Sequence, residues 1–297
     1  MPQTRSIDVL AIGETMALVT PQRPESLDVA EDFSVGIGGA ESNLACHLAH
    51  AGYSAAWFSA LGDDALGRRT RARIAAHGVD VSRVKMDPRA PTGLYVKNPG
   101  AGVVYYRSGS AASRLGPADL EGIEWNEIRV LHISGITPAL SESCRALVDA
   151  AIEAAHRHDV LTSFDVNLRP VLWETPEHAR STLLDIARRS DIVLVGRDEA
   201  EELWGTATAD AVREHLPDTA HLVVKDADVE AVEFSAVGRV EEPTPRVEVV
   251  EPVGAGDAFA AGWLSGLLLG EDPSARLRRG HAAAARALSS TQDVPTT

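Results

Sequence analysis

Lysine is nearly absent from this chain of 297 residues and occurs only at positions 85, 97 and 225. Arginine therefore carries almost all of the positive charge. The scarcity of lysine excludes a G-x-x-x-x-G-K-[ST] phosphate-binding loop, for which no match exists, and the lysine–glutamate set of protein kinases is missing too. If this protein handles ATP, it does so with another architecture.

Cysteine is also scarce, and long hydrophobic runs are missing. Cys46 and Cys144 are far apart in sequence and lack the spacing of metal ligands, so we expect buried free thiols in a reducing cytoplasm. No stretch approaches the roughly 18 apolar residues that span a membrane. Ile7–Ile12 is apolar, but Glu14 soon follows it and no cleavage pattern is present, so we expect no signal peptide.

Acidic residues dominate the charge, and the formal net charge is −15 at pH 7. Such a charge argues against non-specific binding to nucleic acid or to anionic membranes. An anionic substrate therefore needs local basic residues. The apolar share of 44% is ordinary for a globular protein, and the length suits one large domain, alone or with a small appendage.

Short β-rich runs alternate with amphipathic helical stretches over most of the chain. We expect strands at Val9–Ile12, Ala55–Ala60, Val130–Ser134, Val160–Asp165, Ile192–Val195, Leu222–Lys225 and Val247–Val250. We expect helices at Glu41–Ala51, Ala65–His77, Ser141–His158, Glu177–Arg189, Asp198–Leu203, Ala258–Leu269 and Ser274–Leu288. Such alternation gives parallel strands joined by crossover helices, so the sequence predicts an α/β fold of three layers.

Two segments, Thr15–Val35 and Thr92–Arg107, break this alternation. Each has extended character with alternating polar and apolar residues, and neither is followed closely by a helix. The two segments can pair into a small sheet over one edge of the main domain, where they would act as a lid. Two ordinary surface hairpins are the alternative, which periodicity alone slightly favours.

The segment Val253-Gly254-Ala255-Gly256-Asp257-Ala258-Phe259 places a glycine turn and an aspartate before an apolar helix. Gly254 and Gly256 have no Cβ, so the backbone can turn tightly and approach a ligand. The start of the helix offers unpaired N–H groups to a phosphate. Asp257 would repel a resting phosphate, which suggests that it takes a proton from an attacking hydroxyl group. A helix cap is the alternative, and the motif alone leaves both roles open.

A second glycine turn, Gly36-Ile37-Gly38-Gly39-Ala40-Glu41-Ser42-Asn43, precedes another helix. It is not a dinucleotide fingerprint, because that spacing requires glycine where Glu41 stands. A polyol site fits better, since bare backbone at Gly39 can approach a sugar and Asn43 can both donate and accept hydrogen bonds. Taken alone, the motif is more often a tight turn with a helix cap.

Further polar candidates lie in the second extended segment and after two strands. Tyr95 and Tyr105-Tyr106-Arg107 suit a substrate with hydroxyl groups and a carboxylate, although they are also ordinary sheet residues. Asp165-Val166-Asn167-Leu168-Arg169 follows a strand at the end where α/β sheets bind ligands, and a loop of Asx turns is its alternative. Arg169 can neutralise an anion there. Glu199 begins a helix, where the dipole favours any carboxylate.

In this order the motifs resemble the ribokinase-like sugar kinases, also called the phosphofructokinase-B group, over nearly the whole chain. Gly-Ala-Gly-Asp-Ala-Phe is the most specific of them. Within the group the chain is most similar to 2-keto-3-deoxygluconate kinases, through residues 92–95, 105–111 and 133–137. The resemblance implies one kinase domain over residues 1–297, with a central, mostly parallel sheet and lid segments at about 15–35 and 92–107.

The resemblance also implies an activity: phosphorylation of the terminal hydroxyl group of 2-keto-3-deoxygluconate, or a close sugar acid, with ATP and Mg²⁺. Asp257 is then the general base, and Gly254, Ala255 and Gly256 form the anion hole. The implied substrate-binding residues are Gly39, Asn43, Tyr95, Tyr106, Arg107, Ile136 and Arg169. The implied nucleotide-binding residues are Lys225, Ala227, Gly254, Gly256 and His281, and Glu199 acts on magnesium through water.

On the nucleotide side the chain departs from the family pattern. Relatives carry glycines near Ala227 and Glu230, and His281 stands where an asparagine is expected. Three functions therefore stay open: the sugar-acid kinase, a kinase for a neutral ketose such as fructose or ribose, and a sugar-acid-binding protein with little turnover. The open edge of a lid sheet favours a homodimer or a higher homo-oligomer.

Overall fold

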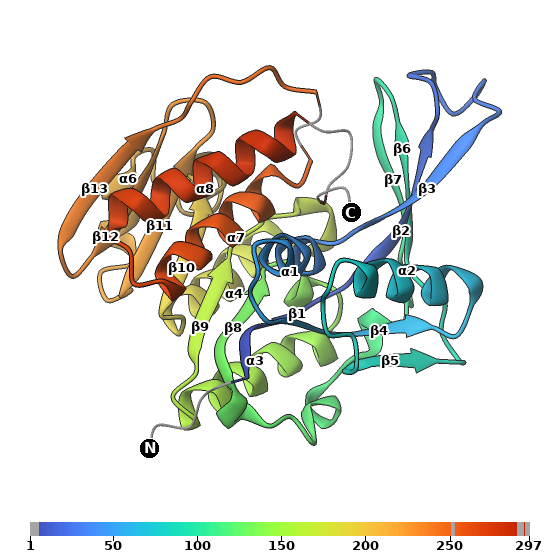
Figure 1. Cartoon of the computed structure of the whole chain (residues 1–297), viewed down its shortest axis with the longest axis horizontal. Helices are drawn as coiled ribbons and strands as arrows, with labels where there is room; N and C mark the ends of the chain where they lie inside the picture. The colour runs from blue at the N-terminus through green and yellow to red at the C-terminus, as the bar shows by residue number, and fades with distance from the viewer. Residues whose placement is uncertain (1–5, 251–252, 290–293, 295–297) are drawn as a thin grey trace.

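One large sheet forms the centre of the molecule (Figure 1). The computed structural model describes residues 6–250, 253–289 and 294. Seven neighbouring strands of this sheet are parallel, and β12 and β13 at one edge are antiparallel. The order of the nine strands is β13 (Gly238–Pro243), β12 (Glu230–Ser235), β11 (His221–Asp226), β10 (Ile192–Gly196), β9 (Leu161–Asp165), β8 (Ile128–Ser134), β1 (Ile7–Ile12), β4 (Ala55–Gly62) and β5 (Val84–Asp87).

Helices cover both faces of the large sheet, because its strands bury apolar side chains on both sides. In β1, Leu10 and Ile12 belong to one core, and Val9 and Ala11 belong to the other. The first core is closed by α3 (Glu142–Arg157), α4 (Pro176–Arg188), α5 (Arg197–Trp204) and α6 (Ala209–His215). The second is closed by α1 (Ala40–His50), α2 (Ala65–Ala76), α7 (Ala255–Leu268) and α8 (Pro273–Leu288). The predicted three-layer α/β fold is confirmed.

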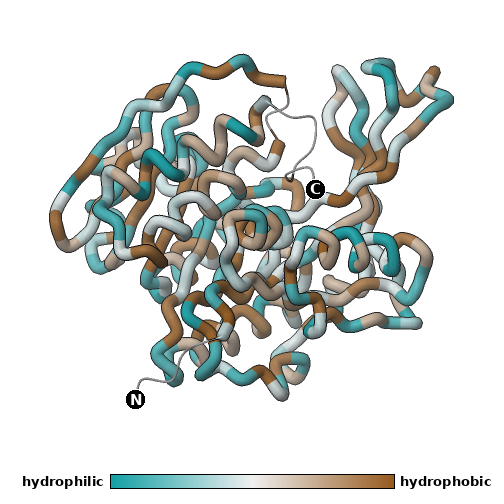
Figure 2. The backbone as a smooth tube through the Cα atoms, viewed as in Figure 1, coloured by the Kyte–Doolittle hydropathy of each residue, from teal (hydrophilic) through white to brown (hydrophobic). Residues whose placement is uncertain are grey.

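A second, four-stranded sheet stands apart from the body in Figure 1. Its order is β3 (Phe33–Gly38), β2 (Met16–Pro21), β6 (Leu94–Asn98) and β7 (Gly102–Tyr106). Each extended segment forms a hairpin, and parallel pairing of β2 with β6 joins the two hairpins. The predicted small sheet is confirmed. Figure 2 shows hydrophobic stretches where its strands leave the body, in keeping with the cluster of Met16, Leu18 and Tyr95.

The small sheet is attached to the body through Thr92, just before β6. Asp64 caps α2 by accepting from the backbone N–H of Gly67 at 2.7 Å, and it also accepts from the N–H of Thr92 at 2.8 Å. The Thr92 hydroxyl group donates to Asp64 and accepts from the N–H of Gly62 at 3.0 Å. The end of β4 and the start of α2 therefore determine where the second hairpin begins.

The predicted strand at Val247–Val250 is wrong. Residues 244–249 form an irregular segment, and the chain instead forms a hairpin of β12 and β13. The sequence analysis missed β12 because the buried, charged Glu233 interrupts its apolar pattern. The Val247–Val250 pattern resembles a strand but finds no partner strand among the described residues.

Glu233 also holds α7 and α8 against the sheet. It accepts from the indole Nε1 of Trp263 on α7 at 2.8 Å and forms a buried ion pair with Arg276 on α8. Burial alone disfavours the charged carboxylate, but hydrogen bonds from His221 and Arg276 bring the pKa of Glu233 below its usual value. Breaking such a buried pair leaves an unpaired charge, so the ion pair holds α8 against the sheet, and the bond from Trp263 holds α7 there.

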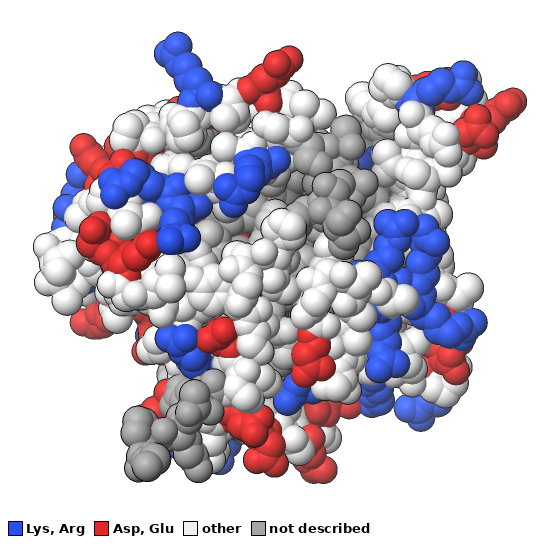
Figure 3. All heavy atoms as spheres, in the orientation of Figure 1, with Lys and Arg blue, Asp and Glu red and all other residues white. Residues whose placement is uncertain are grey.

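The surface charge is uneven. Figure 3 shows Lys and Arg side chains gathered below the small sheet, where α2 carries Arg68, Arg69, Arg71 and Arg73. This basic area contrasts with the net charge of −15 for the chain. In the part of the chain that the structure describes, no helix has the length and apolar character to cross a membrane.

Candidate functional site

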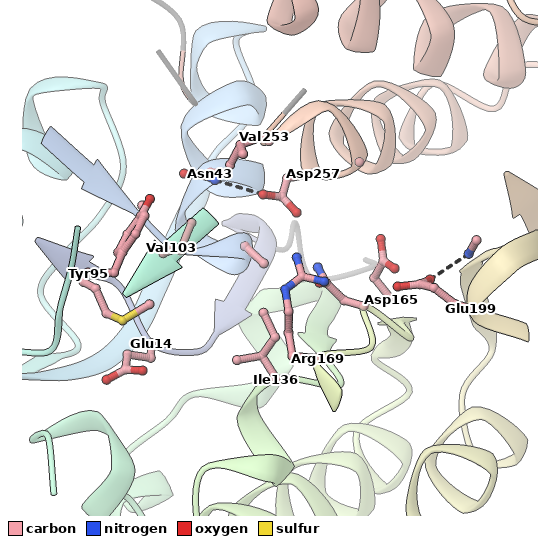
Figure 4. A pocket seen from close by; sticks show the side chains of 18 of the residues that line it. Glu14, Asn43, Tyr95, Val103, Ile136, Asp165, Arg169, Glu199, Val253 and Asp257 are labelled. Carbon is pink, nitrogen blue, oxygen red and sulfur yellow. Dashed lines mark hydrogen bonds between the residues drawn. The ribbon is translucent and has the colours of Figure 1, made fainter. Parts of the chain in front are cut away.

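A cavity of about 550 Å³, which we call the first cavity, lies between the small sheet and the large sheet (Figure 4). Tyr95 and Tyr105 line it from the small sheet, and Ile136 and Arg169 line it from loops that follow β8 and β9. Parallel strands bring their carboxyl ends to one edge, which explains why these loops meet.

A second cavity, of about 1080 Å³, adjoins the first. The two share wall residues, which are Asp198, Glu199, Lys225, Ala227 and Gly256. The remaining wall of the second cavity is largely apolar and includes Val247, Val249, Phe259, Ala284 and Leu288. The pair of cavities can therefore hold two ligands whose ends meet at the shared wall.

The N-terminus of α7 borders both cavities. Gly254 is its N-cap and adopts φ +82°, a conformation that favours glycine. The helix begins at Ala255, three residues earlier than predicted, and its first backbone hydrogen bond runs from Ala258 N to Gly254 O at 2.9 Å. Helix geometry leaves the N–H groups of residues 255–257 without an intrahelical acceptor, which makes an anion site.

Asp257 lies in the first turn of α7 and does not occupy the N-cap position. Its Oδ2 accepts a hydrogen bond from Nδ2 of Asn43, on α1, at 2.9 Å (Figure 4). Burial raises the pKa of Asp257 to about 7, although the bond from Asn43 opposes the shift; the nearby Asp165 adds to it. The carboxyl group can therefore exchange a proton near neutral pH.

Lys225 stands at the wall that the two cavities share. Its Nζ donates to Oδ2 of Asp165 at 2.8 Å. Burial alone would lower the pKa of Lys225, but the carboxylates of Asp165 and Glu199 raise it above its usual value. Lys225 is therefore a fixed cation beside the N-terminus of α7.

Glu199 joins the ends of two strands. Its Oε1 accepts from the N–H of Leu168, after β9, and its Oε2 accepts from the N–H of Gly196, at the end of β10, both at 2.8 Å. Burial raises the pKa of Glu199 despite the nearby charge of Lys225. Because both oxygens already accept backbone bonds, Glu199 is better suited to hold a metal-bound water than to bind a metal ion directly.

Two oxygens near Glu199 suit such a water. Oδ1 of Asp165 and Oδ1 of Asn167 are buried and have no hydrogen-bond partner among the described residues. No group of three or more His, Cys, Asp or Glu side chains in residues 6–250, 253–289 and 294 is arranged to hold a metal ion. The arrangement fits magnesium held through water and brought in by a phosphate ligand.

The two arginines predicted to bind substrate differ in their partners. Arg107 forms an ion pair with the buried Glu14, and Ser110 donates to the same carboxylate at 2.5 Å. Arg169 donates to the backbone oxygen of Leu168 at 2.9 Å, and no carboxylate in the described part of the chain pairs with it. Both line the first cavity, but only Arg169 offers it an uncompensated charge. The sequence analysis missed Glu14, which follows β1 closely.

Tyr106 does not line the first cavity, contrary to the sequence prediction. The register of β6 and β7 pairs Tyr95 with Tyr105, and successive residues of a strand point to opposite faces. Tyr105 therefore lines the cavity and stacks on Tyr95 at 5.9 Å between ring centroids. Tyr106 lies on the outer face and is 62% exposed.

Gly39 and Asn43, predicted for the substrate, lie at the start of α1 and line the first cavity. A Cβ on Gly39 would lie 2.3 Å from the backbone oxygen of Glu14, and one on Gly38 would collide with the hydroxyl group of Tyr95. Close packing therefore requires both glycines, independently of any approach by a sugar.

Glu41, in the same motif, supports the site from beneath. It is fully buried and accepts from the hydroxyl groups of Ser134, at 2.7 Å, and Thr137, at 3.0 Å. A Cβ on Gly13 would collide with its carboxyl group. Glu41 thus joins the ends of β1 and β8 and positions the turn that carries Ile136, a role that the sequence analysis did not assign.

The turn between β11 and β12 borders the second cavity. Ala227 adopts φ +39°, which is strained for a residue with a Cβ. The register pairs Lys225 with Ala231 and Asp226 with Glu230, so Glu230 shares a face with Asp226 and lies opposite to Lys225. Glu230 nevertheless lines the second cavity, whereas Lys225 and Ala227 lie at the wall that the two cavities share.

His281, on α8, is the remaining residue predicted for the nucleotide. Its Nε2 lies 3.1 Å from the backbone oxygen of Glu242, and its ring packs edge-on against Phe259. Burial lowers the pKa of His281, so the ring is neutral at pH 7. It lines the second cavity as a packed aromatic group.

Comparison with known proteins defines the class. The model of the pfkB family of carbohydrate kinases matches residues 6–296. The chain is 34% identical to the 2-dehydro-3-deoxygluconokinase of Bacillus subtilis strain 168, over 97% of this chain and 91% of that protein. It is 33% identical to the Thermoproteus tenax protein of the same name, over 96% and 89%. The crystal structure of a PfkB protein from Polaromonas sp. JS666 superposes with a TM-score of 0.88 at 37% identity, over 98% and 97%.

The fold is thus that of a carbohydrate kinase. The chain belongs to the pfkB family of carbohydrate kinases, and the family predicted from the sequence motifs is confirmed. The relatives that carry the name of a sugar-acid kinase agree with the subgroup to which the motifs pointed.

The strain at Ala227 leads to a prediction for stability. We expect Ala227→Gly to raise the free energy of unfolding by roughly 0.5–1 kcal/mol, because relief of the left-handed conformation exceeds the entropic cost of glycine. Denaturant unfolding measures the change. The matched control is Ala236→Gly, because Ala236 lies in the β12–β13 turn and has no positive φ. This control should lower the free energy of unfolding by about 0.4–1 kcal/mol. Equal losses in both variants would show that position 227 is not strained.

Proposed function

We propose that this chain uses ATP to phosphorylate the terminal hydroxyl group of 2-keto-3-deoxygluconate, which is 2-dehydro-3-deoxygluconate, or of a close sugar acid. We prefer an acid as the substrate because of Arg169. Its guanidinium group lines the first cavity and has no carboxylate partner in the described residues. Arginine matches a carboxylate in geometry and charge. The names of the two relatives support the same substrate.

Asp257 is the general base of the proposed reaction. Asn43 holds its carboxyl group toward the first cavity, where the attacking hydroxyl group of the sugar would lie. Phosphoryl transfer has a loose transition state that needs little deprotonation before attack, so placement matters more than basicity. The free N–H groups of residues 255–257 stabilise the negative charge of the transferring group.

The second cavity is the proposed site of ATP. Its apolar wall suits the base, and its shared wall suits the phosphates, where Lys225 and Gly256 lie. Ala227 and His281 border the nucleotide without donating charge. Magnesium, when bound to the phosphates, neutralises part of their charge, and Glu199 can hold one of its waters.

One observation favours a second candidate, a kinase for a neutral ketose such as fructose or ribose. Glu14 neutralises Arg107, so the first cavity offers one uncompensated arginine where two were expected. A third candidate, a sugar-acid-binding protein with little turnover, is motivated by the strained turn at Ala227. The three differ in which ligands they bind and convert.

A panel of acceptors with Mg-ATP distinguishes these functions. We expect turnover on 2-keto-3-deoxygluconate or its galactonate epimer and little on fructose or ribose, measured by coupled release of ADP. Turnover on a neutral ketose alone would favour the second candidate. If no acceptor is converted and calorimetry detects no binding of ATP, the third candidate, a sugar-acid-binding protein, would be favoured.

The variant Arg169→Met tests whether Arg169 binds the carboxylate of an acid substrate. Loss of one hydrogen-bonded ion pair with the substrate is expected to raise KM for the acid by about 10- to 100-fold, with little change for any neutral ketose. Arg180→Met, at an exposed position on α4 away from both cavities, is the matched control. An unchanged KM for the acid in Arg169→Met would remove the basis for preferring an acid.

Asp257→Asn tests the proposed base. We expect kcat to fall by about 10²- to 10⁴-fold while the affinity for the sugar changes little. In the unmodified protein kcat/KM should fall as pH falls through about 7, because protonated Asp257 cannot accept a proton. The residual activity of Asp257→Asn serves as the control for ionisation of ATP and should lack this inflection. An unchanged kcat, or an inflection that persists in the variant, would remove Asp257 from the mechanism.

We propose a homodimer, or a higher homo-oligomer, formed through the small sheet. The edge strand β7 is exposed along its whole length and is apolar on its outer face, where Val104 and Tyr106 lie. An exposed edge strand of this kind is a template for pairing with another chain. Light scattering should give at least twice the monomer mass, and Val104→Asp should give the monomer; a monomeric unmodified protein would contradict this.

We also infer a cytoplasmic protein whose partners are the sugar and ATP, without nucleic acid or membrane. Support comes from the net charge of −15 and from Cys46 and Cys144, which are buried free thiols. Cell fractionation checks this location.

A further inference from the structure

The segment 244–250 crosses from the β11–β12 turn to the end of α8. At its start, Thr244 donates through its N–H to the backbone oxygen of Val229 at 3.0 Å and through its hydroxyl group to that of Ala227 at 3.1 Å. At its end, the N–H of Val250 donates to the backbone oxygen of Leu288 at 2.8 Å. Backbone bonds thus hold both ends, and residues between them line the second cavity.

Acidic side chains dominate the charge around that cavity. Asp198, Glu199, Asp228 and Glu230 border it, against Lys225 and Arg246 as the cationic side chains among its described lining residues. Lys225 already pairs with Asp165. Arg246 is exposed, and no carboxylate in the described ranges lies within ion-pair distance of it. Among these described lining residues, a nucleoside triphosphate therefore meets one cation that is not already neutralised.

We propose that Arg246 is a donor-binding residue whose guanidinium group binds the phosphate chain of a nucleoside triphosphate in the second cavity. The inference rests on the proposed function and adds to it a residue outside the glycine turn and helix N-terminus that the sequence motifs identify. Arginine suits the task because its planar group can bind two phosphate oxygens at once. Arg246 lines the second cavity, as does Thr244, two residues earlier, which is hydrogen-bonded to the turn that follows Lys225.

Titration calorimetry on the full chain tests the proposal with the Mg²⁺ complex of a non-hydrolysable ATP analogue, and with adenosine. Arg246→Ala is expected to weaken binding of the analogue by about 10- to 100-fold and to leave adenosine binding unchanged. Arg246→Lys should recover part of the loss. Since a phosphate contact is screened by salt, the salt dependence of analogue binding should also decrease in Arg246→Ala.

The matched control is Arg278→Ala. Arg278 is an exposed arginine on α8 that pairs with Glu242 and does not line the cavity, so its loss should leave both affinities unchanged. KM for the sugar and the thermal midpoint without ligand should be the same in Arg246→Ala as in the unmodified protein.

Three results would overturn the assignment. Unchanged affinity for the analogue in Arg246→Ala would show that Arg246 is only a solvated surface residue. Equal losses for the analogue and adenosine would show that the guanidinium group stacks on the base. If the unmodified protein binds no nucleotide, this inference and the proposed ATP site fail together. If Arg246→Ala binds the analogue as tightly as the unmodified protein and turns over normally, this inference alone fails.

Discussion

The placement of one carboxyl group depends on the contact between two helices that are far apart in sequence. Asn43, in the first turn of α1, donates to Asp257, in the first turn of α7, and both helices begin at the first cavity. The bond sets the direction of the carboxyl group, while the free N–H groups beside it attract the phosphate that must come near. Further along α7, Trp263 binds the buried Glu233, so the whole helix is restrained.

Pairing of charges decides which cations remain for ligands. Lys225 is held by Asp165 near Glu199, and Arg107 is held by Glu14. These pairs join the segments that form the cavities, and they remove much of the attraction for anions. In a chain with a net charge of −15, the arginines without a carboxylate partner among the described residues are the cations most available to an anionic ligand. Arg169 is such a residue in the first cavity, and Arg246 in the second.

The sequence allowed much of the fold to be predicted, because parallel strands and crossover helices leave a strong local pattern. It failed where a local pattern was misleading. Glu233 concealed β12, since its partners Trp263 and Arg276 lie thirty and more residues away. Val247–Val250 alternates like a strand, but no strand pairs with it in the described chain. The start of α7 was misplaced, because the glycines that suggested a turn belong to its N-cap and first turn.

The site, like the fold, has features that the sequence predicted and features that it did not. The sequence by itself determined the family and the chemistry of its motifs, because Gly-Ala-Gly-Asp and Gly-Gly-Ala-Glu depend on residues that are adjacent in the chain. Only the tertiary structure decided that Tyr105 faces the first cavity, which follows from the register between β6 and β7. It also decided that Glu14 neutralises Arg107, a pair separated by 93 residues. Register and ion pairing join distant segments, and no local pattern records them.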